Sequence, residues 1–285
     1  MSRGWLVAIT VWCSRRCDVG FGDEILAAGQ AQRLYAHNPF RRVAICDQQS
    51  RPRWHPIWDG NPILATPADV DQGEDVQRLM NAPGCRPYIV YPFTEDTGWT
   101  FNTAFRAREH VARIYLTVDE LRFGVQLQQQ IGPYVLIEPY SKHDNLRWPF
   151  ESWVTLIAAL PDLTFVQHTH VESTRVVPGA RDVMTRTFRD ACGLLASARL
   201  YVRGESGMCH AAAALGIPQV TIWGGCMDWN VLGGYPKQIG ILNYTGGSPC
   251  GRWHPCDHCR RAMAEISVEQ VVQSIQTMLT QEGAA

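Results

Sequence analysis

The segment LYVRGESGMCHAAAALGIPQVTIW, residues 200–223, indicates the fold class of this chain. Its apolar ends are typical of short buried strands, and its alanine-rich middle is typical of a helix that Gly216 and Pro218 bring to an end. A strand, a helix and a second strand in this order form a parallel βαβ unit. We therefore expect an α/β protein.

The same alternation of strands and helices extends towards both ends of the chain. It predicts two Rossmann-like domains with parallel sheets, residues 1–130 and 131–285, joined by a linker at 126–132 and facing a cleft. A capping box of Ser267 and Gln270 starts the last helix, for which packing back onto the first domain is an open alternative. The other expected strands are 5–12, 42–47, 88–91, 133–139 and 163–167, and the other expected helices are 24–35, 150–160 and 188–196.

Composition limits the classes of function. The 285 residues carry a net charge of -1 and are 46% apolar, which argues against a disordered chain and against a generic polyanion-binding protein. No apolar run reaches the roughly 18 residues of a membrane span. Residues 5–13 are faintly similar to a signal peptide, but no small-residue cleavage site follows. We expect a cytoplasmic protein without a transmembrane segment.

A first candidate site is the turn that contains Gly20 and Gly22, before the first helix. Glycines let a ligand approach the backbone, and the helix start offers free N–H groups. Asp47 ends the next strand, where an acid that binds ribose would lie, although Ile25 replaces the third glycine of a dinucleotide motif. A nicotinamide-dependent oxidoreductase therefore stays open, as does a plain turn with Asp23 as N-cap.

Two further turns precede helices of the second half. In the earlier one, Ser141, Lys142 and Arg147 offer hydroxyl, ammonium and guanidinium donors to a diphosphate. In the later one, Glu205 can accept a hydrogen bond from a sugar hydroxyl, and the N–H groups of residues 206–207 can bind phosphate. Solvated polar loops and a simple helix cap are the plain alternatives.

Four stretches together carry a resemblance. They are GDEIL at 22–26, LRWPFESW at 146–153, GESGMCHAAAALGIP at 204–218, and the tail with Cys250, Cys256 and Cys259 followed by ISVEQV at 266–271. These stretches resemble segments of glycosyltransferase family 9, the heptosyltransferase-like glycosyltransferases. The resemblance implies a GT-B fold and inverting sugar transfer from a nucleotide-diphosphate sugar, with no required cofactor or catalytic metal.

The resemblance also implies roles for single residues. Asp23 has the position of the general base, and Gly20 and Gly22 belong to the turn before it. The donor-binding positions are Ser141, Lys142, Arg147, Glu205, Ser206, Gly207 and His210. This chain departs from the family pattern at Leu146, where the family has Lys, and at Glu205, where it has Asp. Its first half, which by the resemblance binds the acceptor, is also short, so we expect an acceptor other than a lipopolysaccharide core. A saccharide and a modified nucleic acid both stay open.

Cys250, Cys256 and Cys259 lie close in sequence, together with His254 and His258. Three thiolates and one imidazole suit a structural zinc ion. The lack of a second closely spaced pair favours plain buried thiols instead, with no metal.

Three other interpretations remain. A nucleotide-sugar epimerase can share the architecture. A relative without catalytic activity would bind sugar or nucleic acid. Six arginines in the first half can form a face for DNA, although ordinary solvated arginines explain them better. These arginines are Arg15, Arg16, Arg41, Arg42, Arg51 and Arg53.

Overall fold

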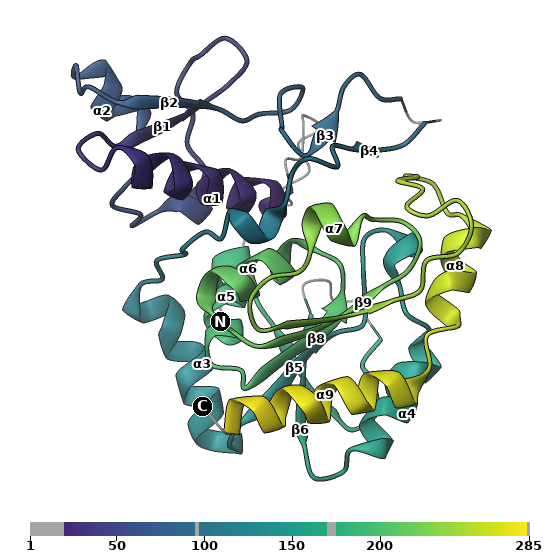
Figure 1. Cartoon of the computed structure of the whole chain (residues 1–285). Helices are drawn as coiled ribbons and strands as arrows, with labels where there is room; N and C mark the ends of the chain where they lie inside the picture. Colours follow the sequence, from purple (N-terminus) through teal and green to yellow (C-terminus); the bar gives the residue numbers. More distant parts are fainter. Residues whose placement is uncertain (1–19, 95–96, 170–174, 284–285) are drawn as a thin grey trace, which may run out of the picture.

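The computed structural model describes residues 20–94, 97–169 and 175–283 (Figure 1). The expected first strand at 5–12, together with Arg15 and Arg16, lies outside these residues. Within them, no helix has both the length and the apolar character that crossing a bilayer requires.

A six-stranded parallel sheet forms the centre of the second half, in the order β10-β9-β8-β5-β6-β7. The α/β class with a parallel sheet is therefore confirmed. The strands are β5 (Tyr134–Glu138), β6 (Thr164–Thr169), β7 (Ala180–Met184), β8 (Leu200–Gly204), β9 (Gln219–Trp223) and β10 (Gln238–Leu242). Strands β7 and β10 were not predicted from the sequence.

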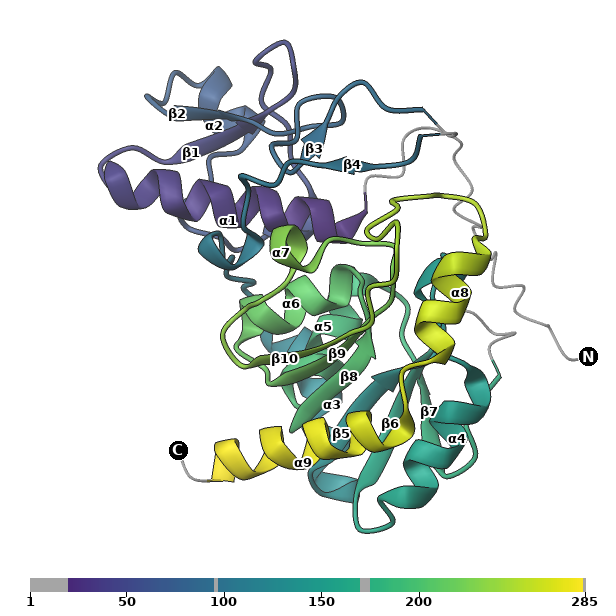
Figure 2. The same cartoon turned by 45° about the vertical axis from the view of Figure 1, so that its right-hand side comes forward.

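Helices cover both faces of this sheet (Figures 1 and 2). Successive residues of β5 point to opposite faces, so that Leu136 packs under α5 and α6 while Ile137 packs under α4 and α9. One face carries α3 (Val118–Ile131), α5 (Phe188–Ala196) and α6 (Gly207–Leu215), and the other carries α4 (Phe150–Ala159) and α9 (Val268–Gly283). Helix α9 thus packs on β9, β10 and α4, and the alternative that it returns to the first half is wrong.

The linker expected at 126–132 is also wrong, because residues 126–131 belong to α3 and Gly132 is its C-cap. Thr117 and Glu120 form a capping box at the start of this helix. Helix α3 packs closely on α5, where Gly124 and Gly193 leave no room for a side chain between the two backbones. The helix therefore belongs to the packing of the second half.

The described strands of the first half differ from the expected single parallel sheet. The described residues of this half form one parallel pair of strands, β1 (Val43–Cys46) and β2 (Gln77–Met80), and an antiparallel pair, β3 (Ile89–Val90) and β4 (Thr100–Phe101). The strand expected at 88–91 therefore exists as β3 but does not extend a parallel sheet. The remaining elements among the described residues are α1 (Phe21–His37), η1 (Pro56–Trp58), α2 (Pro67–Asp71), η2 (Ala107–Glu109), η3 (Asp144–Leu146), α7 (Trp229–Leu232) and α8 (Asp257–Ala264).

One apolar core joins the two halves. Ile25 and Ala28 of α1 share a cluster of buried side chains with Met208 and Ala212 of α6. Both views show α1 lying along α6 (Figures 1 and 2). This packing sets where the turns singled out in the sequence lie relative to each other.

Candidate functional site

The first turns of α1 and α6 meet. A Cβ atom on Gly22 would lie 3.0 Å from Cα of Gly207 and 3.0 Å from Cδ2 of His210, and a Cβ atom on Gly207 would lie 2.9 Å from the backbone N of Gly22. Only glycine fits such an approach of two backbones without a shift. The two turns, which are 185 positions apart in sequence (207 minus 22), therefore form one site.

Asp23 lies in the first turn of α1. The helix starts after Gly20, which has no side chain to cap it, so the plain alternative of Asp23 as N-cap is wrong. Its Oδ1 accepts a hydrogen bond of 2.5 Å from the hydroxyl of Tyr88, and its Oδ2 is 3.1 Å from Nη1 of Arg86. The side chain remains 26% exposed. A carboxylate held by two donors and still open to solvent can accept a proton from a bound hydroxyl.

Arg86 and Tyr88 are site residues that the sequence did not reveal. Both come from an irregular stretch before the two-residue strand β3. Tyr88 is buried, and burial together with the neighbouring Asp23 carboxylate raises its pKa well above the usual value. The hydroxyl therefore stays protonated and serves as a donor to Asp23.

Glu24 lies in the first turn of α1 and points into the protein interior, where it pairs with Arg53. It is fully buried, and its Oε2 is 2.6 Å from Nη1 of Arg53. Burial raises the pKa of Glu24, and Arg53 opposes this only in part. Arg53 is thus engaged in an ion pair inside the first half.

The other described arginines of the suggested DNA face are also paired with carboxylates. Ion pairs join Arg41 to Asp75, Arg42 to Asp69 and Glu74, and Arg51 to Asp47. Asp47 further accepts hydrogen bonds of 2.9 Å from the backbone N–H groups of Gln49 and Arg51. This aspartate, the expected ribose ligand of an oxidoreductase, therefore closes its own turn.

On the α6 side, Glu205 and His210 are buried next to each other. Nε2 of His210 is 3.8 Å from Oε1 of Glu205, and Nδ1 of His210 is 2.7 Å from the hydroxyl of Tyr235. Burial raises the pKa of Glu205 to about 7, with Arg203 lowering it and Asp23 raising it further. Burial lowers the pKa of His210 to about 4, so the imidazole is neutral at neutral pH.

Ser206 caps α6, since its Oγ accepts a hydrogen bond of 3.2 Å from the N–H of Met208. Ser206 and Gly207 keep partly exposed surfaces. The start of a helix carries a positive partial charge and free N–H groups, which suit an anion. The turn at 205–207 therefore brings a buried carboxyl group next to a helix start of the kind that suits an anion.

A buried polar network supports this turn from within the sheet. Glu138 ends β5 and lies beside Arg203 of β8, with 2.6 Å between Oε2 and Nη1. His168 and Tyr201 also hydrogen-bond the Glu138 carboxylate. Burial alone would raise the pKa of Glu138, but Arg203 and His168 together hold it well below the usual value. Nη2 of Arg203 donates 3.1 Å to the carbonyl oxygen of Tyr140 and so fixes the start of the 140–147 loop.

In the 140–147 loop, some of the side chains expected to bind phosphate already make contacts within the protein. Nε of Arg147 donates 2.6 Å to the carbonyl oxygen of Ser141, and the guanidinium lies 4.3 Å from the ring centroid of Tyr140 and 2.5 Å from Asp144. Ser141 is buried, whereas Lys142 is exposed. Leu146 is buried and offers no charge where the family has Lys.

The same loop touches the α1–α6 site through its backbone. The carbonyl oxygen of Leu146 would lie 2.6 Å from a Cβ atom on Gly204, at the end of β8. The side chain of Arg147 instead lines a pocket of about 400 Å³ on the α4 side, with Phe150 and Arg175. The structure thus unites Asp23, Glu205, Ser206, Gly207 and His210, while Arg147 opens onto a separate pocket.

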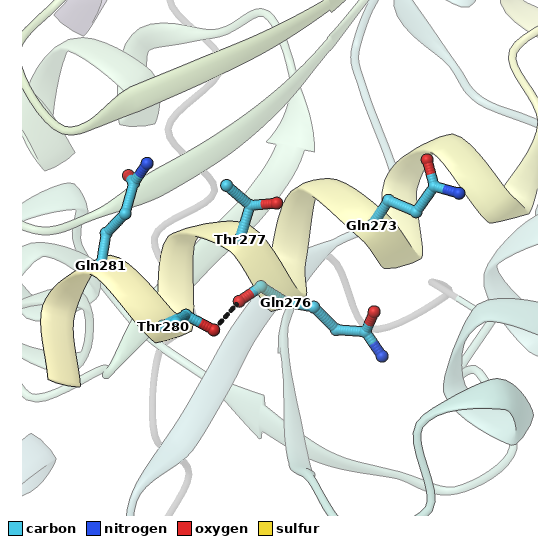
Figure 3. Close-up of a pocket in the computed structure, with 5 residues that line it drawn as sticks. All are labelled: Gln273, Gln276, Thr277, Thr280 and Gln281. Atoms are coloured by element: carbon cyan, nitrogen blue, oxygen red, sulfur yellow. Dashed lines mark hydrogen bonds between the residues drawn. The ribbon is translucent and has the colours of Figure 1, made fainter. Parts of the chain in front are cut away.

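A pocket of about 410 Å³ lies along α9 (Figure 3). Its lining comes from α9 alone: Gln273, Gln276, Thr277, Thr280 and Gln281. None of these side chains titrates, and Thr280 already donates 2.8 Å to the carbonyl oxygen of Gln276. Neither pocket contains Asp23 or Glu205.

Comparison with known proteins assigns the family. The family model "Glycosyltransferase family 9 (heptosyltransferase)" matches residues 102–251, which is more than half of the chain. The chain belongs to glycosyltransferase family 9. The predicted family and the predicted class, a glycosyltransferase, are confirmed, and the oxidoreductase interpretation has no support.

Sequence relatives of this family 9 chain include lipopolysaccharide heptosyltransferase 1 of two bacteria. The Escherichia coli O18:K1:H7 (strain RS218 / NMEC) enzyme is 27% identical over 134 residues, which cover 44% of this chain and 41% of that enzyme. The Salmonella typhimurium enzyme is 27% identical over 233 residues, 65% of this chain and 73% of that enzyme. The match with the first enzyme therefore spans less than half of its length.

Solved structures of family 9 share the fold. The glycosyl transferase family 9 from Veillonella parvula DSM 2008 superposes with a TM-score of 0.63 at 13% identity, covering 92% of this chain and 95% of that one. The E. coli ADP-heptose lps heptosyltransferase II superposes with a TM-score of 0.57 at 15% identity, covering 93% and 97%. The prediction of a GT-B fold is thereby confirmed.

Proposed function

We propose that this family 9 protein transfers a heptose-type sugar from a nucleotide-diphosphate donor to a hydroxyl group of a saccharide, with inversion at the anomeric carbon. One observation carries the proposal. The Asp23 carboxylate and the 205–207 turn lie at one junction, where α1 meets α6. A base and an anion-binding helix start are the two parts that this reaction requires.

In the proposed reaction, Asp23 accepts the proton of the acceptor hydroxyl while the oxygen attacks the anomeric carbon. The bond from that carbon to the diphosphate oxygen breaks on the opposite side, so the configuration inverts. The leaving diphosphate gains negative charge, which the N–H groups of residues 206 and 207 stabilise together with the dipole of α6. Arg86 and Tyr88 orient the base. No step requires a catalytic metal.

The proposed donor is ADP-heptose. The support for this donor is that the E. coli structural relative is an ADP-heptose lps heptosyltransferase. Glu205 would hydrogen-bond a hydroxyl of the transferred sugar, since burial brings its pKa to about 7 and leaves part of the carboxyl groups protonated at neutral pH. Lys142, exposed on the 140–147 loop, is the proposed cation for the diphosphate.

The proposed acceptor is a saccharide rather than DNA. All four described arginines of the suggested DNA face are paired with carboxylates, which removes the main argument for a polyanion. We also propose that the first half, up to about residue 130, binds the acceptor and that the second half binds the donor. The core shared by α1 and α6 implies that the two halves act as one unit.

Thermal-shift titration tests the class of donor. We expect ADP and ADP-heptose to raise Tm, because a ligand at about 100 times its Kd stabilises the folded state by about 2.7 kcal/mol. UDP, GDP and NAD should shift Tm less. AMP is the matched control, since it lacks the β-phosphate that the N–H groups of residues 206 and 207 would bind. Stabilisation by NAD alone would overturn the proposal.

A further inference from the structure

A second cluster of reactive side chains lies on the loop that follows β10 and on the start of α8. The ligand atoms of Cys250, Cys256, His258 and Cys259 all lie within 4.8 Å of one another. Sγ of Cys250 is 3.1 Å from Sγ of Cys259, which is 3.6 Å from Nδ1 of His258. Cys259 is fully buried and Cys256 is 9% exposed. Three thiols and an imidazole thus converge on one small volume.

A fourth thiol, that of Cys226, lies beside this cluster and comes from a distant part of the chain. Cys226 follows β9 through Gly224 and Gly225. The N–H of Gly251 donates 2.9 Å to the carbonyl oxygen of Cys226, and the N–H of Cys250 donates 2.9 Å to that of Gly225. The side chain of Cys226 is buried. The cluster therefore joins the exit of β9 to the segment 250–259.

The orientation of His258 suits a metal ligand. Its Nε2 is 3.1 Å from Oγ of Ser248, which leaves Nδ1 directed at the thiols. A hydrogen bond at one ring nitrogen is the usual means of fixing the other as a ligand.

A disulfide explains the cluster less well. A bond between Cys250 and Cys259 would use two sulfurs and leave Cys226, Cys256 and His258 gathered around them without a function. Tetrahedral zinc has Zn–S distances of about 2.3 Å, so its ligand atoms are separated by roughly 3.8 Å, a spacing compatible with this cluster. Thiolates with one imidazole select zinc or iron over magnesium or calcium.

We propose that Cys250, Cys256 and Cys259 bind one structural transition-metal ion, zinc or iron, and that Cys226 or His258 supplies the fourth ligand. This site is independent of the proposed sugar transfer. The sequence alone favours buried thiols without a metal, because it shows only one closely spaced pair of cysteines. The fold supplies what the sequence lacked, since Cys226 reaches the cluster across 23 intervening residues (227–249).

The ion would fix the loop next to the donor site. Nδ2 of Asn145 donates 2.9 Å to the carbonyl oxygens of Arg252 and His254, and its Oδ1 accepts 2.7 Å from the N–H of Cys256. On the other side, the N–H of Trp99 donates 2.9 Å to the carbonyl oxygen of Gly251. The metal-bearing segment therefore contacts both the 140–147 loop and the β4 side of the first half.

Metal analysis of the full chain, purified with reductant and without chelator, tests this site. We expect about one ion per chain, with colourless protein for zinc and visible thiolate-to-metal absorption for iron. Titration with a mercurial thiol reagent should release the ion in proportion to the thiols modified. Chelation should lower Tm by about 5–10 °C, and return of the same metal should restore it.

Single substitutions locate the ligands. Cys259→Ala should remove the metal, whereas Cys192→Ala, an equally buried thiol in α5, should retain it. Loss of metal in Cys226→Ala or in His258→Ala assigns the fourth ligand. The proposal is overturned if reduced wild-type protein contains less than about 0.1 ion per chain and takes up neither zinc nor iron. It is equally overturned if peptide mapping finds a Cys250–Cys259 disulfide in freshly isolated protein.

Discussion

Asp23→Asn should lower kcat for sugar transfer by about 10²–10⁴-fold, the usual contribution of a general base. Asparagine has nearly the same shape and still accepts the hydrogen bond from Tyr88, but it cannot take a proton from the acceptor. Affinity for the donor should stay within about twofold, because the diphosphate would bind at the start of α6. Initial rates of ADP release and calorimetric titration with ADP measure the two effects separately.

The matched control for this variant is Asp119→Asn. Asp119 also lies in the first turn of a helix, α3, but its side chain is 80% exposed and pairs only with Arg122 among the described ion pairs. The Asp119→Asn variant should retain the wild-type kcat. Transfer by Asp23→Asn within about threefold of the wild type would show that another group removes the proton.

Arg203→Met should destabilise the folded protein by about 3–5 kcal/mol, the usual result of removing one partner of a buried ion pair. The substitution leaves Glu138 buried with His168 and Tyr201 but without its cation. It also frees the start of the 140–147 loop, since Arg203 holds the carbonyl oxygen of Tyr140. Urea denaturation followed by circular dichroism measures the change in the free energy of unfolding.

Two comparisons separate this effect from general damage. Arg203→Met with Glu138→Gln removes both charges and should recover most of the lost stability. Arg122→Met breaks an exposed pair and should cost less than about 1 kcal/mol. A single variant that loses less than about 1 kcal/mol, or a double variant no more stable than the single one, would contradict this account of the network.

The same network predicts a dependence on pH. The folded state holds the pKa of Glu138 below the usual 4.5, so its contribution to stability is complete above that value and is lost as the pH falls below it. The difference in stability between wild type and Arg203→Met should therefore be largest near pH 7 and shrink below about pH 4.5. Denaturation at pH 7 and pH 4 checks the sign.

The second half of the fold was largely predictable because its elements carry clear local signals. Strands β8 and β9 each carry three large apolar residues and are buried along their whole length, and Gly216 ends α6 in the left-handed conformation, at a φ of 73°. The capping box of Ser267 and Gln270 is present in both directions, at 3.0 and 3.3 Å. Such signals act within a few residues and need no knowledge of distant contacts.

The elements that were missed lack such signals. Strand β7 lies at the sheet edge and has only Val183 fully buried, so its sequence shows no apolar run. The end of α3 is rich in glutamine, a pattern that predicts a linker. In the structure only Gly124 and Leu127 of this helix are buried, so the helix has no clear apolar face in its sequence. Its helical state depends on packing against α5, which no local pattern reveals.

For the site, the sequence indicated the residues that start helices and missed those that support them. Asp23 and Glu205 lie at turns between regular elements, where glycines and charges are informative. Arg86 and Tyr88 approach Asp23 from an irregular stretch more than 60 residues away, and only the fold brings them there. The sequence also did not reveal that the Arg147 guanidinium contacts Ser141 and Tyr140. These contacts depend on the conformation of the 140–147 loop.

A crystal structure with bound ADP tests the central claim most directly. The account predicts the β-phosphate within hydrogen-bond distance of the backbone N–H groups at residues 206 and 207, with its free oxygen directed towards Asp23. A diphosphate bound elsewhere, such as in the Arg147 and Arg175 pocket, with the start of α6 empty, would contradict it.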